Sequence, residues 1–144
     1  MVKTEAVKFL VTEECGRLAR WLRLMGYDTA QATMQSLTEL YRMAYSQHRI
    51  VVTRNSRVSA SCLFPVIHLN SPLLEEQLRQ LLRELKLELD DIRFFTRCDR
   101  CNVPVEEMEK PLVRDLVPPY VYRTQERFFS CPSCQRIYWP ATHW

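Results

Sequence analysis

Short apolar runs alternate with amphipathic stretches in the N-terminal part of the chain. Nearly continuous apolar runs occur at Val7–Val11, Ile50–Thr53 and Val66–Leu69, a pattern typical of strands that are covered on both faces. A weaker strand signal lies at Thr29–Thr33. Between these runs, apolar residues recur at helical spacing. Strands and helices therefore alternate through about Leu89, which predicts an α/β fold with a small parallel sheet flanked by helices.

Three helices are predicted, two of them between these strands and one after the last strand. The first spans Arg17–Met25, and Gly26 is placed to end it in the left-handed conformation. A capping box at Ser36–Glu39 predicts the start of the second helix, which runs to about Gln47. Ser71 and Pro72 predict the start of the third, with proline at the first helical position. In the first helix the arginines are expected on the solvated face, opposite the apolar stripe: Arg17, Arg20 and Arg23.

The pattern changes toward the C-terminal end, where short aromatic segments, turns and cysteines replace the alternation. We therefore predict two modules, an α/β domain over residues 1–92 and a second module over 93–144. Within the second module, strand-like sequence occurs at Val103–Val105 and Arg136–Trp139. The segment Asn102–Ser130 contains several prolines and is expected to be a loop with short strands.

The second module carries two Cys-x-x-Cys pairs separated by 29 residues, Cys98 with Cys101 and Cys131 with Cys134. Each pair can turn two sulfurs toward one point, so the four thiolates can close a tetrahedral zinc site. Such a site has no open coordination position, and the zinc is expected to hold structure without taking part in chemistry. Together with the nearby strands, the two pairs predict a zinc ribbon.

Two disulfides in a secreted protein are the alternative interpretation of these pairs. The N-terminal residues carry no long apolar segment followed by a small-residue cleavage site, which favours metal binding and a cytoplasmic location. The other two cysteines, Cys15 and Cys62, have no nearby cysteine and are expected to be buried as small apolar residues.

Composition narrows the class of protein further. The chain has 144 residues, of which 47% are hydrophobic and 26% charged, as expected for a globular domain with a small module attached. No apolar run approaches the roughly 20 residues that a membrane-spanning helix needs. All but four of the 20 basic residues are arginine, whose guanidinium can hold a phosphate through two parallel hydrogen bonds. This bias fits a nucleic-acid partner, and it also fits an ordinary solvated surface.

Four stretches of the chain carry a resemblance to a known family. They are GRLARWLRLMGYDT from Gly16, RIVVTRN from Arg49, VPPYVY from Val117 and IYWPATHW from Ile137. In this order, with the two cysteine pairs, they resemble the Mut-seven C-terminal RNase domain family, over nearly the whole chain. The resemblance implies a PIN-like nuclease fold with a zinc ribbon near its C-terminus.

The resemblance also implies a chemistry. PIN-type nucleases hold one or two Mg²⁺ or Mn²⁺ ions on acidic side chains at the carboxyl ends of parallel strands, and the metal activates a water that attacks an RNA phosphate. This chain departs from that pattern, because Thr12, Thr38 and Asn55 stand where the family usually has aspartate. Threonine and asparagine offer an oxygen without negative charge, so we expect Mg²⁺ or Mn²⁺ binding to be severely weakened.

Four acidic residues remain as catalytic candidates near the expected site: Glu13, Glu14, Asp28 and Glu39. Glu13 or Glu14 could replace the missing first-strand aspartate through a shift in register. For Glu39 the competing interpretation is its role in the capping box, and for Asp28 it is that of a turn or cap acceptor.

Basic and aromatic residues supply the candidate RNA contacts. The candidate nucleic-acid-binding residues are Arg17, Arg20, Arg54, Arg57 and His143, whereas Arg42 and Arg49 are expected to be merely solvated. His143 could also be a general base or a structural residue. Aromatic residues of the ribbon could stack unpaired bases, although packing around the zinc site is the interpretation we favour for this set: Phe94, Phe95, Phe128, Phe129, Tyr138, Trp139 and Trp144.

These expectations combine into one predicted function and two alternatives. The predicted function is a protein of an RNase family that binds RNA or a ribonucleoprotein and whose metal site is degraded, which leaves weak nuclease activity or, in a pseudoenzyme, none. The first alternative is an active Mg²⁺- or Mn²⁺-dependent endoribonuclease that uses the remaining acids. The second is a protein–protein adaptor that binds its partner through the ribbon. None of the three involves a membrane.

Overall fold

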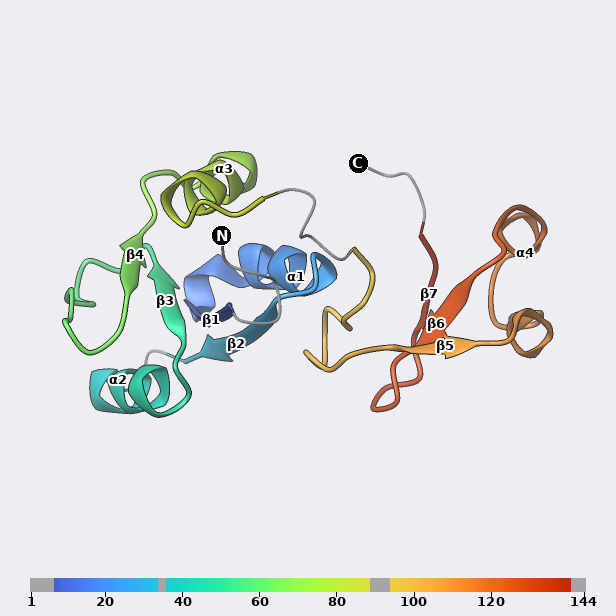
Figure 1. The fold of residues 1–144 in the computed structure, drawn as a ribbon, viewed down its shortest axis with the longest axis horizontal. Helices are drawn as coiled ribbons and strands as arrows, with labels where there is room; N and C mark the ends of the chain where they lie inside the picture. Colours follow the sequence, from blue (N-terminus) through green and yellow to red (C-terminus); the bar gives the residue numbers. More distant parts are fainter. Residues whose placement is uncertain (1–6, 34–35, 89–93, 141–144) are drawn as a thin grey trace.

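A four-stranded parallel sheet forms the centre of the N-terminal part of the molecule (Figure 1). The computed structural model describes residues 7–33, 36–88 and 94–140. The strand order is β2-β1-β3-β4, and the strands are β1 (Lys8–Thr12), β2 (Asp28–Ala32), β3 (Ile50–Thr53) and β4 (Val66–His68). All three neighbouring pairs run parallel. The predicted parallel sheet is confirmed, and each strand lies within a residue of its predicted range.

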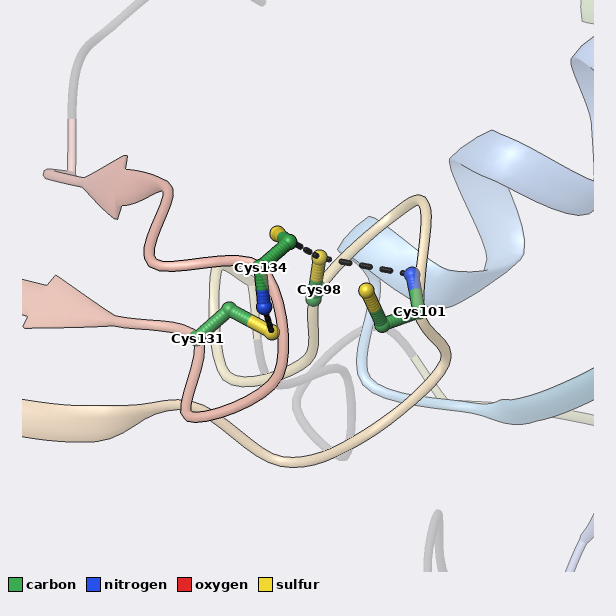
Figure 2. A group of neighbouring side chains, drawn as sticks. All are labelled: Cys98, Cys101, Cys131 and Cys134. Atoms are coloured by element: carbon green, nitrogen blue, oxygen red, sulfur yellow. Dashed lines mark hydrogen bonds between the residues drawn. The ribbon is translucent and has the colours of Figure 1, made fainter.

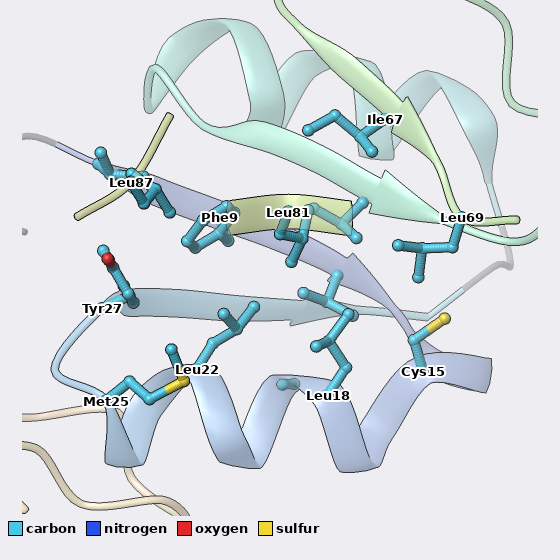
Figure 3. Packing of buried hydrophobic residues seen from close by; sticks show 14 residues of the cluster. Phe9, Cys15, Leu18, Leu22, Met25, Tyr27, Ile67, Leu69, Leu81 and Leu87 are labelled. Atoms are coloured by element: carbon cyan, nitrogen blue, oxygen red, sulfur yellow. The ribbon is translucent and has the colours of Figure 1, made fainter. Parts of the chain in front are cut away.

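Helices cover both faces of this sheet. One face is covered by α1 (Gly16–Leu24) and α3 (Leu74–Glu84), and the other by α2 (Leu37–Ser46). Because side chains alternate along a strand, Phe9 and Val11 join the core beneath α1 and α3, while Leu10 joins the core beneath α2. Figure 3 shows the first of these cores, in which Leu18 and Leu22 of α1 approach Phe9 of the sheet. Burial on both faces explains why the two central strands, β1 and β3, are mostly apolar.

The ends of α1 and α2 follow the predicted signals. Gly26 adopts a φ of 98°, the left-handed conformation that ends α1. Ser36 caps α2, since its hydroxyl oxygen accepts a hydrogen bond from the amide of Glu39 at 3.2 Å. The Glu39 carboxylate pairs with Arg42 at 3.1 Å, so its predicted use in a capping box is replaced by an exposed ion pair.

Two local predictions for the helices are wrong. Helix α3 begins at Leu74, after Ser71 has formed a turn in which its hydroxyl accepts from the Leu73 amide at 3.0 Å. Proline therefore precedes the helix and does not occupy its first position. Arg23 does not face solvent, because its side chain is buried and its Nε donates to the carbonyl oxygen of Thr29 at 2.8 Å.

The C-terminal part forms a separate antiparallel sheet. Its strand order is β5-β6-β7, and the strands are β5 (Glu106–Met108), β6 (Phe128–Ser130) and β7 (Ile137–Tyr138). The strand predicted at Arg136–Trp139 is thus present in shorter form. The strand predicted at Val103–Val105 is wrong, since Pro104 makes only an isolated bridge to Arg97 and the strand begins at Glu106.

The segment predicted as a loop contains helical structure. A 3-10 helix spans Lys110–Val113, and α4 spans Pro119–Thr124. Proline in the first turn suits both elements, because that turn needs no amide donor there. Their buried residues complete a small core with β6: Val113, Val117, Val121 and Phe128.

The two parts of the molecule touch through α1 and β2. We call residues 94–140 the ribbon. Near its start, the Phe95 amide donates to the carbonyl oxygen of Leu24 at 2.8 Å. Farther along, the side chain of Asn102 donates to Asp28 at 2.8 Å and accepts from the Thr29 amide at 2.9 Å. The predicted boundary between residues 92 and 93 lies outside the described residues. Within the described ranges, none of the helices has the length and apolar character needed to cross a membrane.

Candidate functional site

The carboxyl ends of β1 and β3 meet at one edge of the parallel sheet. Each strand ends in a fully buried threonine, Thr12 and Thr53. Their hydroxyl oxygens lie 2.8 Å apart, within hydrogen-bonding distance of each other. The hydroxyl of Thr53 also accepts from the Asn55 amide at 2.9 Å. This edge is where ligands bind in open parallel sheets, and the family resemblance placed the metal site here.

Glu14 projects its carboxylate onto this pair of threonines. It lies in the 3-10 helix Glu13–Cys15 that follows β1 directly. Its Oε1 atom accepts from the Thr12 hydroxyl at 2.6 Å, the Thr53 hydroxyl at 3.1 Å and the Arg54 amide at 3.1 Å. Burial alone would raise the pKa of Glu14, but these hydrogen bonds outweigh it and lower the pKa below its ordinary value. Glu14 is therefore held as a carboxylate.

A cleft opens beside this carboxylate. Its volume is about 410 Å³, and its lining residues are Glu13, Glu14, Arg54 and Asn55; we call this feature the cleft. The side-chain oxygen of Asn55 accepts from the Arg57 amide at 2.9 Å, which places the exposed Arg57 in the turn beside the cleft. The structure thus brings together two candidate acids and one candidate arginine, with a second arginine nearby.

Asp28 lies at the amino-terminal ends of the strands, opposite the end where the cleft lies. It is the first residue of β2 and pairs with Lys8, the first residue of β1, whereas the cleft is at the carboxyl ends. Its carboxylate accepts from Arg49 at 2.9 Å and from Asn102 of the ribbon at 2.8 Å. Burial would raise the pKa of Asp28, but these hydrogen bonds lower it. Asp28 is therefore not brought to the cleft.

Arg49, expected to be solvated, is buried. Besides its ion pair with Asp28 it donates to the carbonyl oxygen of Phe9 at 3.0 Å. Its role is structural, and the prediction of a solvated side chain is wrong because the partner residues are distant in sequence.

The remaining cleft candidates are more scattered. Thr38 and Glu39 lie in the first turn of α2, both exposed, with Glu39 in its ion pair with Arg42. His143 and Trp144 lie outside the described residues. Of the arginines predicted on α1, Arg17 is exposed, and Arg20 donates to Asp99 of the ribbon through two N–H groups at 3.1 and 3.0 Å.

The four cysteines of the two pairs converge in the ribbon (Figure 2). Their sulfur atoms all lie within 4.8 Å of one another, and those of Cys98 and Cys134 are 3.8 Å apart. Four sulfurs around one zinc at a Zn–S distance of about 2.3 Å stand about 3.8 Å apart, so the residues fit a tetrahedral ion. All six cysteines are free thiols, so none of them forms a disulfide. The four cysteines could therefore hold a metal ion such as zinc.

Neighbouring groups favour the thiolate form at this centre. Amides of the two turns point at sulfur, from Cys101 to Cys98 at 3.4 Å and from Cys134 to Cys131 at 3.4 Å. Burial alone would raise the pKa of the Cys98 thiol, but the Tyr138 hydroxyl and the backbone amides of Cys101 and Arg100 lower it to about 7. A metal-binding cysteine must lose its proton, so the lowered pKa suits the role. Among the described residues, no other group of three or more His, Cys, Asp or Glu side chains is placed to share an ion.

Asp99 is a structural residue that the sequence analysis missed. It lies between the first two cysteines, is 4% exposed, and accepts from the Tyr138 hydroxyl at 2.6 Å as well as from Arg20. Arg23 donates to its carbonyl oxygen at 2.9 Å. The cysteine centre is thereby fastened to α1. An acidic residue between the cysteines of a Cys-x-x-Cys turn is a sequence signal for a structural role. Its partners on α1, however, cannot be predicted from the spacing of residues.

The other cysteines and the aromatic residues divide between packing and exposure. Cys15 is buried as expected, whereas Cys62 is exposed, so that prediction is wrong. Phe128 is fully buried and contacts Trp139 edge-on, which supports the packing interpretation for those two. Phe129 lies beneath Arg127, and Phe94 is 41% exposed. A small hollow of about 160 Å³ is lined by Phe95, Ile137, Tyr138 and Trp139.

Comparison with known proteins supports the family resemblance. A family model described as the Mut7-C RNAse domain matches residues 7–144. The chain showed no match among the curated proteins or the solved structures. The matched range includes the parallel sheet, the cleft and all four cysteines of the ribbon.

Proposed function

This chain belongs to the Mut7-C RNAse domain family, and from that premise we propose that it binds RNA at the cleft with little or no metal-dependent cleavage. The observation that carries the proposal is the state of Glu14. One oxygen of its carboxylate already accepts three hydrogen bonds from the protein. The neighbouring side chains at the strand ends, Thr12 and Asn55, are neutral.

Weak metal binding follows from this arrangement. Mg²⁺ gives up its water reluctantly and demands near-octahedral oxygen ligands, so it depends on accessible carboxylates. The Asn55 oxygen accepts from a backbone amide and the Thr12 hydroxyl donates to Glu14, so neither is presented to an ion. The two arginines of this edge, Arg54 and Arg57, supply positive charge that attracts a phosphate without a bridging metal.

We further propose that the ion held by the ribbon is zinc and that its role is structural. The four sulfur ligands fill a tetrahedral shell and leave no position for a substrate. The partner is proposed to be RNA or a ribonucleoprotein. The cytoplasmic location, the module boundary and the adaptor alternative, in which the ribbon binds a protein, stay predictions.

An active metal-dependent endoribonuclease is the second candidate, and one observation favours it. Glu13 and Glu14 both line the cleft, close to where the family pattern has its first-strand aspartate. Mg²⁺ sites in phosphoryl-transfer enzymes can use as few as one or two protein carboxylates together with substrate phosphates. Asp28, predicted from the sequence as a further catalytic acid, lies at the opposite end of the strands from the cleft.

Binding to a mixed pool of labelled single-stranded RNA, followed by fluorescence anisotropy without divalent metal, tests the proposal. Affinity is expected to fall steeply with salt, because counterions leave the phosphates on binding. Arg54→Ala is expected to weaken binding and to reduce the slope of log K against log salt by about 0.7, the value for one phosphate contact on a single strand. Arg114→Ala, which removes an exposed charge just after the 3-10 helix of the ribbon, is the matched control. Equal losses in the two variants, or no binding at low salt, would reject the proposal.

A further inference from the structure

A hollow lies along α1, and it shares no lining residue with the cleft. Its volume is about 280 Å³, and it is lined by Arg17, Arg20, Trp21 and Leu24. The last three residues lie three, four and seven positions after Arg17, so all four share one face of the helix over about 10 Å. Two cations and an indole ring are thus presented side by side.

This hollow adjoins the aromatic hollow of the ribbon. Leu24 lines the first and Phe95 lines the second, and the Phe95 amide donates to the Leu24 carbonyl oxygen at 2.8 Å. Phe95 has a φ of 62°, a left-handed conformation that is rare for a bulky side chain. Arg20 and Tyr138 make a second connection between the hollows, because both donate to the carboxylate of Asp99.

We propose that these two hollows, together called the α1 groove, bind the continuation of a single-stranded RNA whose phosphates occupy the cleft. The inference rests on the proposed function. Glu14 of the cleft stands only three residues before Arg17, at the point where the 3-10 helix leads into α1. A strand leaving the cleft therefore meets the cations of α1 first and the aromatic hollow of the ribbon next.

The chemistry of the groove matches an unpaired strand. Its residues combine cations with aromatic rings, the combination that binds single strands with little sequence preference, since every base has a face that can stack. The lining of both hollows contains no aspartate or glutamate among the described residues. The carboxylate that joins the two hollows, that of Asp99, is 4% exposed and accepts from Arg20 and Tyr138, so it is not presented to a phosphate in the groove.

The sizes of the two hollows, about 280 Å³ and 160 Å³, are compatible with single bases or phosphates of a strand. A polymer can occupy such hollows one base or phosphate at a time. Arg20 is fixed by its two hydrogen bonds to Asp99, so it is a preorganised cation, and Arg17 makes no ion pair within the described residues.

The test compares two lengths of single-stranded RNA, one of about 4 nucleotides that spans the cleft alone and one of about 12 that also reaches the groove. Trp21→Leu keeps an apolar side chain and removes the stacking surface. It is expected to weaken the longer strand at least about fivefold and to leave the shorter one unchanged. Arg17→Ala, at an exposed position, is expected to act in the same way with a smaller loss, and Arg114→Ala is the control. Ultraviolet crosslinking of the longer strand to the peptide that contains Trp21 gives a readout that a purely structural role would not produce.

The outcomes separate this inference from the proposed function. If Arg54→Ala loses affinity for both RNA lengths while Trp21→Leu and Arg17→Ala bind as before, the cleft remains an RNA site and RNA binding at the α1 groove is overturned. That result would assign the groove to another occupant, such as a protein. Absence of RNA binding at both lengths would overturn the proposed function and this inference with it. If Trp21→Leu fails to fold, as judged by circular dichroism, Arg17→Ala decides alone.

Discussion

Replacing Asp99 with asparagine is expected to weaken the attachment of the ribbon to α1. The carboxylate is buried and accepts hydrogen bonds from Arg20 and from the Tyr138 hydroxyl, and Arg136 lies within 3.6 Å of it. Asparagine has nearly the same shape, so no cavity forms and the change isolates the charge. The negative charge disappears while the three groups that were arranged around it stay.

The magnitude follows from these contacts. The Arg20 side chain is 60% exposed, so its ion pair with Asp99 is screened and contributes about 1 kcal/mol. The Tyr138 hydrogen bond to a buried carboxylate contributes about 2 kcal/mol, within the range for charged acceptors. Asp99→Asn is therefore expected to lower the free energy of unfolding by about 3 kcal/mol, which corresponds to a melting temperature about 10 °C lower.

Thermal unfolding followed by circular dichroism, with proteolysis of the folded protein, is the assay. The variant is expected to melt earlier and to be cut sooner between residues 94 and 140, because the ribbon loses its fastening to α1. Glu75→Gln is the matched control, since Glu75 forms an exposed ion pair with Arg79 whose loss changes stability by less than about 0.5 kcal/mol. A melting temperature for Asp99→Asn within a degree or two of the control would refute the reasoning.

Three further predictions follow from the same structure. Chelation of the proposed zinc is expected to make the ribbon sensitive to protease while strands β1–β4 are still protected, because only the ribbon depends on the four thiolates. Unchanged protease sensitivity of the ribbon after chelation would count against a metal centre. Glu14→Gln is expected to make stability less dependent on pH in the acid range. The folded-state pKa of Glu14 is lowered, so its carboxylate stabilises the fold above the unfolded-state pKa and loses that effect as the pH falls through the folded-state pKa. The contribution to the free energy of unfolding is no more than about 1 kcal/mol because the residue is exposed. Identical acid unfolding curves for the unmodified protein and Glu14→Gln would contradict this prediction. Arg49→Met is expected to cost about 3 kcal/mol in urea unfolding, because it removes both the ion pair with the half-buried Asp28 and the hydrogen bond to the Phe9 carbonyl oxygen. Arg42→Met on the exposed face of α2 is expected to be nearly neutral, and similar losses in the two variants would disprove the structural role of Arg49.

The sequence sufficed for the features that depend on local pattern. The strands at Val7–Val11 and Ile50–Thr53 are apolar because both faces of the sheet are covered, and that requirement is visible in single runs. The four cysteines could be predicted as a group for a similar reason, since the Cys-x-x-Cys spacing of each pair suits two ligands of one metal ion. The sequence predicts only that Glu13 or Glu14 lies at the site. The 3-10 helix that follows β1 determines that Glu14 is the one that contacts the threonines.

Features that depend on distant residues were out of reach. Arg23 and Arg49 have the spacing of solvated arginines, and they are buried because partners far along the chain surround them. Asp99 contacts Arg20 across 79 residues of sequence. Helix α4 is hidden in the sequence for a different reason: its prolines are typical of loops, although proline in a first turn is also compatible with a helix.

We propose that the cleft of this family member attracts phosphate directly and lacks the ligands for a catalytic metal. The most direct test incubates single-stranded RNA with the zinc-loaded protein and its Glu14→Gln variant, with and without Mn²⁺, and measures cleavage and binding together. We predict no Mn²⁺-stimulated cleavage, and binding to Glu14→Gln that is unchanged or up to about fivefold tighter because one negative charge beside the phosphates is gone. Robust Mn²⁺-dependent cleavage that disappears in Glu14→Gln would contradict the account.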